Sequence, residues 1–343
     1  MKQRERLTMK YTRSPWQGWL PAAAVTGALA LTLTACGGGD AKNPDVAEQP
    51  SVAMLSVEAE GSPWADLAWG ALVDLEESRD IAVHRVAGVD SAAVEQQVRA
   101  MAAAGHNPVV VMQDELGDAA AKLAPSFPDT SFIVVDSFIE TDEPNVKTIV
   151  IDPTQAAYVA GVVASELSAS KRIGFVGGAD VPNIQKYLCG LTEGVAANDS
   201  SVAVDVAYTG NFDNPTSGRE VAASQLQSGA DIVMHAAALT GLGVITAAEE
   251  AGASAIGVDV WQGDAASDDT VVWNALKDGH GAVLAAVESV LDGTFEAGQL
   301  VWDSTQGAAL YDERDFERLD ADLQEKVATA AEQLTSGAVK TDC

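Results

Sequence analysis

The sequence predicts an α/β protein, and three observations carry that prediction. From Ser51 onward, short apolar runs rich in β-branched residues alternate with segments of helical length, which is the order that builds parallel sheets through right-handed crossovers. The runs at 108–112 and 131–136 are apolar at successive positions, as expected for strands buried on both faces. Several runs end in small or polar residues just before a helix, namely at Asp136, Gly177, Gly178, His235 and Asp259. Ligands of doubly wound sheets gather at such carboxyl ends.

The individual elements follow from this alternation. Strands are predicted at 51–57, 81–87, 108–112, 131–136, 146–151, 172–176, 202–208, 231–235, 254–258 and 270–276. Helices are predicted at 64–80, 91–105, 115–124, 154–169, 184–197, 216–228 and 241–252. Residues 51–343 are predicted to form one domain of two lobes that face each other across a cleft. The first lobe is about 51–150 with a returning segment near 262–295. The second lobe is about 152–258 with the C-terminal segment.

The N-terminal segment has the pattern of an export signal. Residues 2–13 carry five basic residues and one acid, and an apolar stretch from Leu20 to Ala35 ends in Leu33-Thr34-Ala35-Cys36. This ending resembles a bacterial lipobox, in which residues 1–35 are the signal peptide and Cys36 takes the lipid. The stretch is short for a membrane span of about 20 residues. An ordinary signal peptide and an anchor helix are the alternatives. A start at Met9 would not change the argument, because the basic and apolar parts follow it. Residues 36–50 would then be a flexible tether to the extracytoplasmic face of the cell membrane.

The charge of the chain argues against some partners. The 343 residues carry a formal net charge of −30, and because the segment before Cys36 holds five positive charges and one negative, the remainder is near −34. Such acidity argues against nucleic acid or an anionic membrane surface and fits a solvated surface in a salty or cell-envelope setting. After Cys36 only Cys189 and Cys343 remain. Cys189 lies in an apolar helical stretch and is predicted to be a buried thiol; a disulfide with Cys343, which an oxidising compartment permits, is the alternative.

Motifs for catalysis are weak. The histidines lack metal-ligand spacing, and neither a Gly-x-Ser-x-Gly elbow nor a P-loop occurs. Gly174-Phe-Val-Gly-Gly178 lacks the full dinucleotide fingerprint. Thr240 is expected to be the N-cap of the helix that follows it, and the acids Asp268 and Asp269 are expected to be solvated. These patterns favour a binding protein without a metal or cofactor over an enzyme.

Several segments, in order, resemble one family. They are Lys171-Arg-Ile-Gly-Phe-Val-Gly-Gly-Ala-Asp-Val-Pro182, Asn211-Phe-Asp-Asn-Pro215, Gly229-Ala-Asp-Ile-Val-Met-His-Ala-Ala237, Thr240-Gly-Leu-Gly243 and Ile256-Gly-Val-Asp259. From about 52 to 310 the chain is similar to the basic membrane protein, or PnrA-like, family of substrate-binding lipoproteins of ABC importers. The resemblance implies the type I periplasmic-binding-protein fold, with two Rossmann-like lobes joined by three crossings. It also implies a small-molecule ligand and an ABC permease as partners.

Characterised members of this family bind nucleosides, purine nucleosides in particular, so the resemblance implies site residues. Asp259 and Lys277 match an Asp and a Lys that hold the ribose hydroxyls, and a carboxylate beside an ammonium suits a vicinal diol. Asp136 matches an Asp near the base edge, and Trp64 falls at the Phe on which the base stacks. The remaining candidate ligand residues are His235, Ala238 and Trp261.

The chain departs from the family pattern at several of these positions. Ala65 replaces an Asn, Gln113-Asp114 replaces a Gly-Phe pair, and Trp261 stands where an acid is usual. Ala238-Leu239 replaces paired glycines, which is expected to narrow that wall. Polar partners of the base are thus lost more than those of the ribose, which reduces discrimination between bases. Trp64, Trp261 and Trp273 are expected to make the cleft rich in aromatic side chains.

These observations together favour a lipid-anchored solute-binding protein that captures a nucleoside or related ribosyl compound by closure of its lobes. A sugar or another small polar ligand is the alternative within the binding class. A lipoprotein sensor or surface antigen without transport is the alternative from another class, and a nucleoside hydrolase is the remote one because no acid–base pair stands out.

Overall fold

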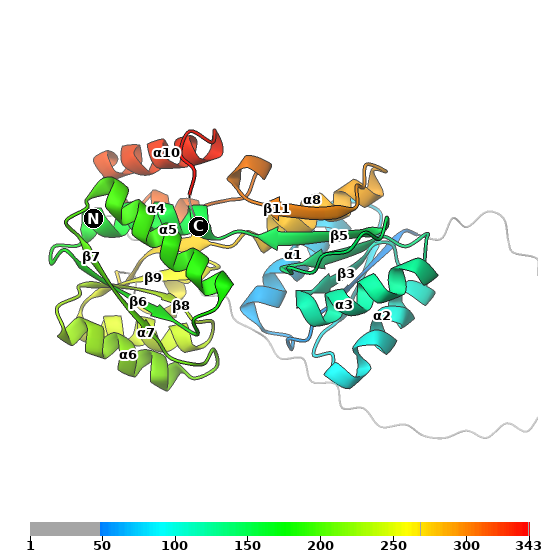
Figure 1. Ribbon diagram of the computed structural model, residues 1–343, viewed down its shortest axis with the longest axis horizontal. Helices are drawn as coiled ribbons and strands as arrows, with labels where there is room; N and C mark the ends of the chain where they lie inside the picture. Colours follow the sequence, from blue (N-terminus) through cyan, green and yellow to red (C-terminus); the bar gives the residue numbers. More distant parts are fainter. Residues whose placement is uncertain (1–48, 268, 342) are drawn as a thin grey trace, which may run out of the picture. The chain divides into compact units, whose positions relative to one another are not determined.

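The computed structural model of the chain describes residues 49–267, 269–341 and 343. The predicted signal peptide, the lipidation site Cys36 and most of the tether lie outside these residues. Two sheets lie within them, and every strand pair of both is parallel (Figure 1). The α/β prediction is therefore confirmed. None of the helices in the described part of the chain is long and apolar enough to cross a membrane.

The first sheet has the strand order β11-β5-β4-β3-β1-β2. Its strands are β1 (Ser51–Leu55), β2 (Ala82–Val86), β3 (Val109–Met112), β4 (Phe132–Val135), β5 (Val146–Ile151) and β11 (Gly298–Trp302). Its helices are α1 (Pro63–Ser78), α2 (Val94–Ala103), α3 (Gln113–Leu123) and α8 (Gly279–Leu291). Val110 and Met112 pack in one core with residues of α1 and α8, whereas Val109 and Val111 pack in another with residues of α2 and α3. Both faces of the sheet are thus covered, which is why its central strands are apolar throughout.

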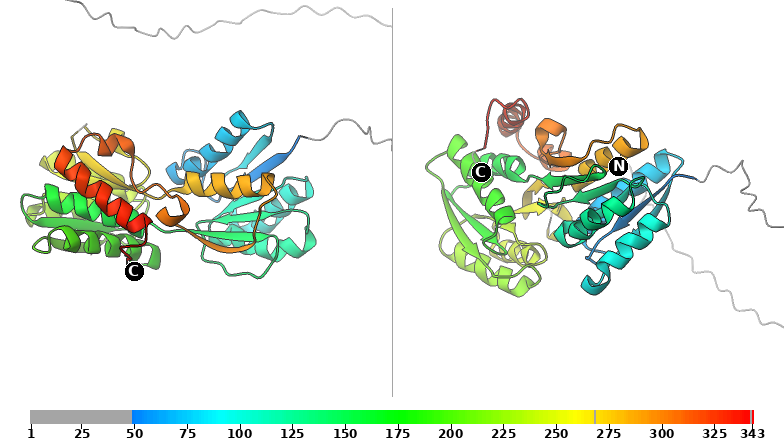
Figure 2. Two further views of the ribbon diagram at one scale, coloured as in Figure 1. Left: turned by 90° about the horizontal axis from the view of Figure 1, so that it is seen from above. Right: turned by 45° about the vertical axis from the view of Figure 1, so that its right-hand side comes forward.

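The second sheet has the strand order β10-β9-β8-β6-β7. Its strands are β6 (Arg172–Gly177), β7 (Ala203–Tyr208), β8 (Ile232–Ala236), β9 (Ser254–Asp259) and β10 (Val271–Leu276). Its helices are α4 (Thr154–Leu167), α5 (Pro182–Asn198), α6 (Pro215–Gln227), α7 (Thr240–Ala251), α9 (Glu313–Phe316) and α10 (Ala321–Thr335). Figure 2 shows α10 alongside α4, which it contacts. We call each sheet with its helices a lobe.

The chain passes between the sheets three times, the number that the family resemblance implies. It leaves β5 for α4 at Asp152, leaves β10 for α8 at Lys277, and leaves β11 for α9 through residues 303–312. The segment that returns to the first lobe begins only at α8 and not near residue 262. The reason is that β10 pairs with β9 in the second sheet, with Trp273 opposite Ile256.

The predicted strands and helices up to residue 276 are all present, but β11 was not predicted. This strand lies at the edge of the first sheet beside β5. Its residues alternate between partly buried and exposed positions, and only Trp302 is fully buried. An edge strand with one solvated face lacks the continuous apolar run that identified the central strands β3 and β4.

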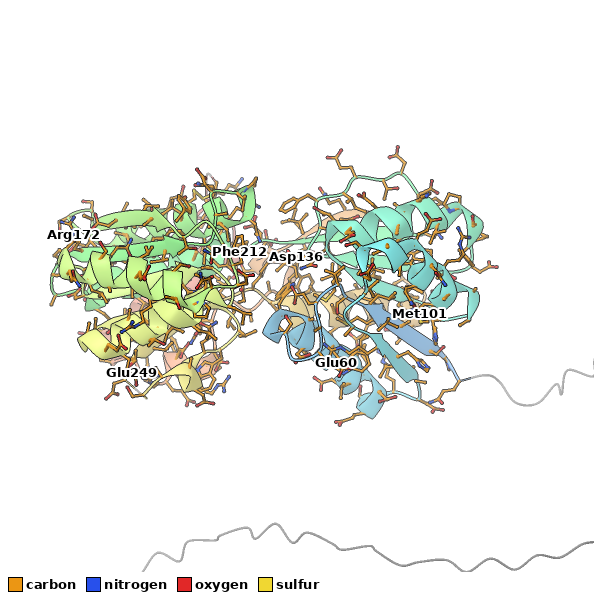
Figure 3. The ribbon with its side chains drawn as sticks, turned by 90° about the horizontal axis from the view of Figure 1, so that it is seen from below. Glu60, Met101, Asp136, Arg172, Phe212 and Glu249 are labelled. Atoms are coloured by element: carbon orange, nitrogen blue, oxygen red, sulfur yellow. A yellow bond between two sulfur atoms is a disulfide. The ribbon has the colours of Figure 1, made fainter. Side chains whose placement is uncertain are left out.

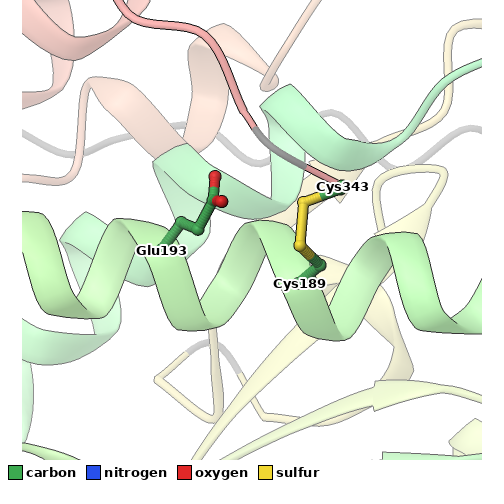
Figure 4. A group of neighbouring side chains, drawn as sticks. All are labelled: Cys189, Glu193 and Cys343. Atoms are coloured by element: carbon green, nitrogen blue, oxygen red, sulfur yellow. A yellow bond between two sulfur atoms is a disulfide. The ribbon is translucent and has the colours of Figure 1, made fainter.

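The prediction of a buried thiol at Cys189 is wrong, because Cys189 forms a disulfide with Cys343 (Figure 4). The buried residues of α5 are Ile184, Tyr187, Gly190, Leu191, Gly194 and Val195. Cys189 lies off this face and is only half-buried. Glu193 is close to both sulfur atoms, but sulfurs joined to each other are not available as thiolate ligands for a metal.

We expect the disulfide to contribute measurably to the stability of the second lobe. It closes a loop with a sequence separation of 154 residues, and a disulfide typically adds about 2–4 kcal/mol to the free energy of unfolding. Cys189→Ser should therefore lower the free energy of unfolding by about that amount in urea titrations. Cys343→Ser and the double variant should show the same loss, since each removes one and the same bond. An unchanged urea midpoint in the single variants would contradict the expectation.

Candidate functional site

Four residues at strand ends adopt an unusual backbone conformation. Gln113, Asp136, Ala238 and Asp259 have φ angles of 71°, 57°, 47° and 67°. They follow or end β3, β4, β8 and β9. The left-handed conformation costs a residue with a Cβ atom about 1–2 kcal/mol, and such strain clusters at functional sites. All four residues line one cavity.

This cavity, which we call the strand-end cavity, has a volume of about 240 Å³ and is lined from both lobes. The first lobe contributes Glu58, Trp64, Gln113 and Asp136; the second contributes Asn183, Ile184, Tyr187, Phe212, Ala236, Ala237, Ala238, Val258 and Asp259; Lys277 comes from a crossing. Asp136 and Phe212 are labelled in Figure 3, on the facing ends of the two lobes. The carboxyl ends of parallel strands thus build the cavity, as expected for this kind of sheet.

A buried ion pair lies at one wall of the cavity. The Nζ atom of Lys277 is 2.7 Å from Oδ2 of Asp136, and their side chains are only 5% and 16% exposed. The same ammonium lies 4.7 Å from the centroid of the Trp64 ring. An ammonium has three N–H donors, so the pair with Asp136 leaves donor capacity for a bound molecule.

The acidic residue Asp259 lies beside Lys277, and a backbone hydrogen bond joins the two residues. The Lys277 N–H donates to the Asp259 carbonyl oxygen at 3.0 Å. The Tyr187 hydroxyl donates to Oδ1 of Asp259 at 2.5 Å. Burial, and next the negative charge of Asp259, hold the pKa of Tyr187 well above its ordinary value. Tyr187 therefore stays protonated and fixes one carboxylate oxygen, which leaves Oδ2 of Asp259 to accept from a ligand.

Besides Tyr187, two aromatic rings line the cavity, Trp64 from the first lobe and Phe212 from the second. Trp64 belongs to the first turn of α1 and packs on Gly279, where an added Cβ would lie 2.8 Å from the ring. Its Nε1 is buried and has no hydrogen-bond partner among the described residues. Phe212 comes from the loop between β7 and α6, packs on Gly178 and is 39% exposed. The two rings provide apolar surfaces for a flat ligand group.

The loop that carries Phe212 is held by Thr240. The Thr240 hydroxyl donates to Oδ1 of Asn211 at 2.8 Å and accepts from the Asn214 N–H at 2.9 Å. The expectation that Thr240 caps its own helix is wrong, because the N-cap of α7 is Leu239 and Thr240 is the first helical residue. Its hydroxyl instead fastens a neighbouring loop.

Two predicted ligand residues, His235 and Trp261, do not line the cavity. His235 is fully buried in β8, and its Nε2 is 2.8 Å from Oε1 of Gln262. Burial lowers the pKa of His235, so the ring is neutral and Nε2–H donates to the amide oxygen. Trp261 donates from Nε1 to Oδ1 of Asp315 at 3.2 Å, and the Arg314 guanidinium lies 3.7 Å from the centroid of its ring.

These two side chains instead belong to a polar network behind the cavity. Asn274 donates to Oδ2 of Asp315 at 2.8 Å, and its own Oδ1 accepts from the Gln262 N–H at 3.0 Å. The network therefore joins His235, Gln262, Asn274, Asp315 and Trp261. It holds the loop that directly follows Asp259. We infer that its role is to fix the position of that carboxylate.

Some cavity residues were not predicted, and one aromatic prediction is wrong. Glu58, Gln113, Asn183, Tyr187 and Phe212 line the cavity without having been candidates for ligand contact. Tyr187 follows the helical spacing of core residues, and nothing in the sequence separates it from them. Conversely, Trp273 is fully buried in the core beside Tyr311, with ring centroids 5.2 Å apart, and does not line the cavity.

A larger hollow, of about 590 Å³, lies between α4, α5 and α10. Its charged groups are exposed, and two of them already pair, since Glu166 accepts from Lys326 at 2.6 Å and from Asn198 at 3.1 Å. Buried, convergent polar groups mark a binding site more reliably than volume does. The strand-end cavity is therefore the candidate site.

The buried carboxyl group of the network predicts a pH effect. Burial raises the pKa of Asp315. The hydrogen bonds from Asn274 and Trp261 lower it, but burial has the larger effect. As pH rises, the unfolded chain ionises at this residue before the folded chain does, so the parent should lose stability relative to an Asp315→Asn variant. Urea unfolding of both proteins from about pH 3.5 to about pH 7 measures this difference. A difference that stays constant across this range would show that Asp315 does not titrate as argued.

Comparisons with known proteins agree with this architecture. The family described as "ABC transporter substrate-binding protein PnrA-like" matches residues 51–330. A "nucleoside-binding protein BmpA" of an ABC transporter from Lactococcus lactis is 27% identical over 240 residues, which cover 65% of this chain and 68% of that protein. "Basic membrane protein A" from Borreliella burgdorferi is 27% identical over 202 residues, which cover 58% of this chain and 60% of that protein.

A solved structure extends the comparison to the fold. An ABC transporter solute-binding protein from Aeropyrum pernix superimposes with a TM-score of 0.71 at 23% identity, covering 85% of this chain and 92% of that chain. The predicted fold of periplasmic-binding-protein type is thereby confirmed. Because the family match covers most of the chain, this protein belongs to the PnrA-like family of ABC transporter substrate-binding proteins.

Proposed function

We propose that this protein captures a nucleoside, with purine nucleosides favoured, for an ABC importer. The observation that carries the proposal is the composition of the strand-end cavity. Two aromatic rings, Trp64 and Phe212, lie in the same cavity as an acceptor, Asp259, and a donor, Lys277. A flat base between rings and a vicinal diol between a carboxylate and an ammonium would use all four groups. The name of the Lactococcus relative supports the same ligand class.

In this proposal the two halves of the ligand have different partners. The ribose hydroxyls donate to the free oxygen of Asp259 and accept from Lys277. The base stacks on Trp64 and Phe212, and its N–H groups donate to the oxygen of Asp136 that Lys277 does not use. Purines are favoured because their larger ring face covers more of the aromatic surface.

Capture would proceed by closure of the lobes. Trp64 and Asp136 belong to the first lobe, whereas Asp259 and Phe212 belong to the second. A ligand that contacts both sets at once stabilises the closed state and shifts the population toward it. Lys277 lies where the chain crosses between the lobes, so the rotation would displace it little. Membership in a substrate-binding family supports a receptor over an enzyme.

We also propose that the protein is anchored outside the cytoplasm by a lipid on Cys36. Substrate-binding proteins of this family work outside the cytoplasm, and the sequence before Cys36 has the pattern of a lipoprotein signal. A lipid on this residue would hold the receptor near its permease. Mass spectrometry of the protein from the membrane fraction tests the anchor, with Cys36→Ser as the variant that should be released.

A thermal-shift screen against nucleosides, free bases, ribose and common sugars tests the ligand class. A ligand at a hundred times its dissociation constant adds about 2.7 kcal/mol of stability. Shifts with nucleosides but not with bases or ribose alone would support a site for a stacked base and a diol. A shift with ribose or another sugar only would mean that the protein is a sugar receptor.

Asp259→Asn should weaken nucleoside binding about tenfold to a hundredfold, because a hydrogen bond to a charged group contributes about 1.5–3 kcal/mol. The Asn oxygen can still accept from Tyr187, so the fold should be preserved. Calorimetric titration with adenosine measures the loss, with the exposed Asp118→Asn as the matched control. The parent should prefer adenosine to 2′-deoxyadenosine, and the variant should lose most of this preference. Equal affinities of parent and variant would refute the assignment of the diol to Asp259.

Trp64→Ala should weaken the binding of a nucleoside by about 1–3 kcal/mol, the usual contribution of a base stacked on an aromatic ring. Trp64→Phe should retain most of the affinity, because a ring remains. Ribose, which has no ring to stack, should be affected less than adenosine by the same change. If adenosine binds equally well to the Ala variant, the base does not lie on this side chain.

A further inference from the structure

A second, smaller hollow adjoins the strand-end cavity. It has a volume of about 120 Å³ and shares Glu58, Trp64, Ala238 and Asp259 with the cavity. Its other lining residues are Ser62, Leu239, Leu242, Val260 and Gln262. We call this hollow the side pocket. Because four lining residues are common to both, a ligand in the cavity can extend into the side pocket.

The walls of the side pocket suit an apolar group. Leu239, Leu242, Val260 and the ring of Trp64 are its apolar members. The neighbouring polar atoms are mostly occupied: Ser62 donates to Glu58, and Glu58 accepts from Gln113 at 3.0 Å. The amide oxygen of Gln262 accepts from His235. A polar substituent would therefore find few free partners here.

Two of the apolar residues of the side pocket are exposed. Leu239 is 50% exposed and Leu242 is 42% exposed, although both lie beside the candidate site. Covering such surface with an apolar group is favourable because it removes apolar area from water. The side pocket thus offers binding free energy that an unsubstituted nucleoside would leave unused.

The position of the side pocket indicates which part of a nucleoside faces it. Asp259 and the ring of Trp64 border the side pocket, but Asp136 and Lys277 do not. In the proposed function Asp259 holds the ribose hydroxyls and Asp136 binds the N–H edge of the base, so that edge points away from the pocket and the ribose lies toward it. C5′ is the exocyclic ribose carbon, and its hydroxyl is the one that belongs neither to the diol nor to the bond to the base. A substituent that enters the pocket would therefore be attached at C5′.

We propose that the preferred ligands are nucleosides that carry a compact apolar group at C5′, such as an alkylthio group. This inference rests on the proposed function, because it places the diol on Asp259. A volume of about 120 Å³ is about four times the share of one water molecule, so the group is limited to a few non-hydrogen atoms. Trp64, Leu239 and Leu242 are then residues that determine specificity.

The test compares matched pairs of ligands by calorimetric titration of the purified protein. Adenosine, inosine and uridine are each titrated beside their 5′-deoxy-5′-methylthio derivatives, and N6-methyladenosine serves as the ligand with its methyl group on the base. The methylthio derivative of the best-binding nucleoside should bind about tenfold tighter or more, because a group of this size in an apolar pocket discriminates by about 10- to 200-fold.

Matched variants test whether the leucines of the side pocket receive the methylthio group. Leu239→Ser/Leu242→Ser should reduce the preference for the methylthio derivative to less than about threefold, mainly by weakening the binding of the methylthio derivative itself. Both leucines are exposed, so the variant should fold. Leu167→Ser, at the end of α4 and 41% exposed, is the control and should keep the preference.

Each of the other outcomes overturns the proposal, and the first three leave the proposed function intact. Unsubstituted nucleosides that bind as tightly as their methylthio derivatives would refute the side pocket alone. If N6-methyladenosine gains as much affinity over adenosine as the methylthio derivative does, the side pocket does not face C5′. A preference that persists in the double leucine variant would show that another surface receives the methylthio group. If none of the nucleosides or derivatives binds, the proposed function itself fails and this inference fails with it.

Discussion

The buried pair of Lys277 and Asp136 is the interaction on which the candidate site depends. Lys277 lies at a crossing between the lobes and Asp136 at the end of a strand of the first sheet, so the pair ties the crossing to that sheet. Removing one partner of a buried pair costs about 3–5 kcal/mol because a charge is left uncompensated. A ligand that displaced Asp136 from Lys277 would bear part of that cost. The three donors of an ammonium avoid the conflict, since Lys277 can keep Asp136 and still donate to a bound molecule.

The carboxylate of Asp259 is held in position by the buried polar residues around it. Tyr187 fixes one oxygen of Asp259. The network of His235, Gln262, Asn274, Asp315 and Trp261 holds the loop that follows it. Side chains locked in this way hold their geometry before the ligand arrives, which reduces the ordering cost of binding. Residues that never touch the ligand can therefore still affect its affinity.

The sequence was sufficient to predict the elements with a continuous apolar pattern, but it did not separate lining residues from supporting ones. β3 and β4 are apolar at every position because both faces of the sheet are covered, whereas β11 at the edge carries no such pattern. Trp64, Asp136, Ala238, Asp259 and Lys277 were all predicted and share one cavity. His235 and Trp261 lie close in sequence to cavity residues, yet their side chains belong to the network. Successive side chains of a strand point to opposite faces, so Ala236 lines the cavity while His235 joins the network, and the sequence does not reveal which face meets the cavity.

Ala238 illustrates why a departure from the family pattern carries information. It has a φ of 47°, a conformation that glycine adopts without penalty but alanine only at a cost of about 1 kcal/mol. The resemblance places paired glycines here, so this chain keeps the backbone conformation of a glycine while carrying side chains at both positions. The Cβ atom at 238 and the leucine at 239 would only reduce stability if they had no role in binding. Both residues line the side pocket, and a nucleoside with an apolar C5′ substituent would recover that loss through contact with them.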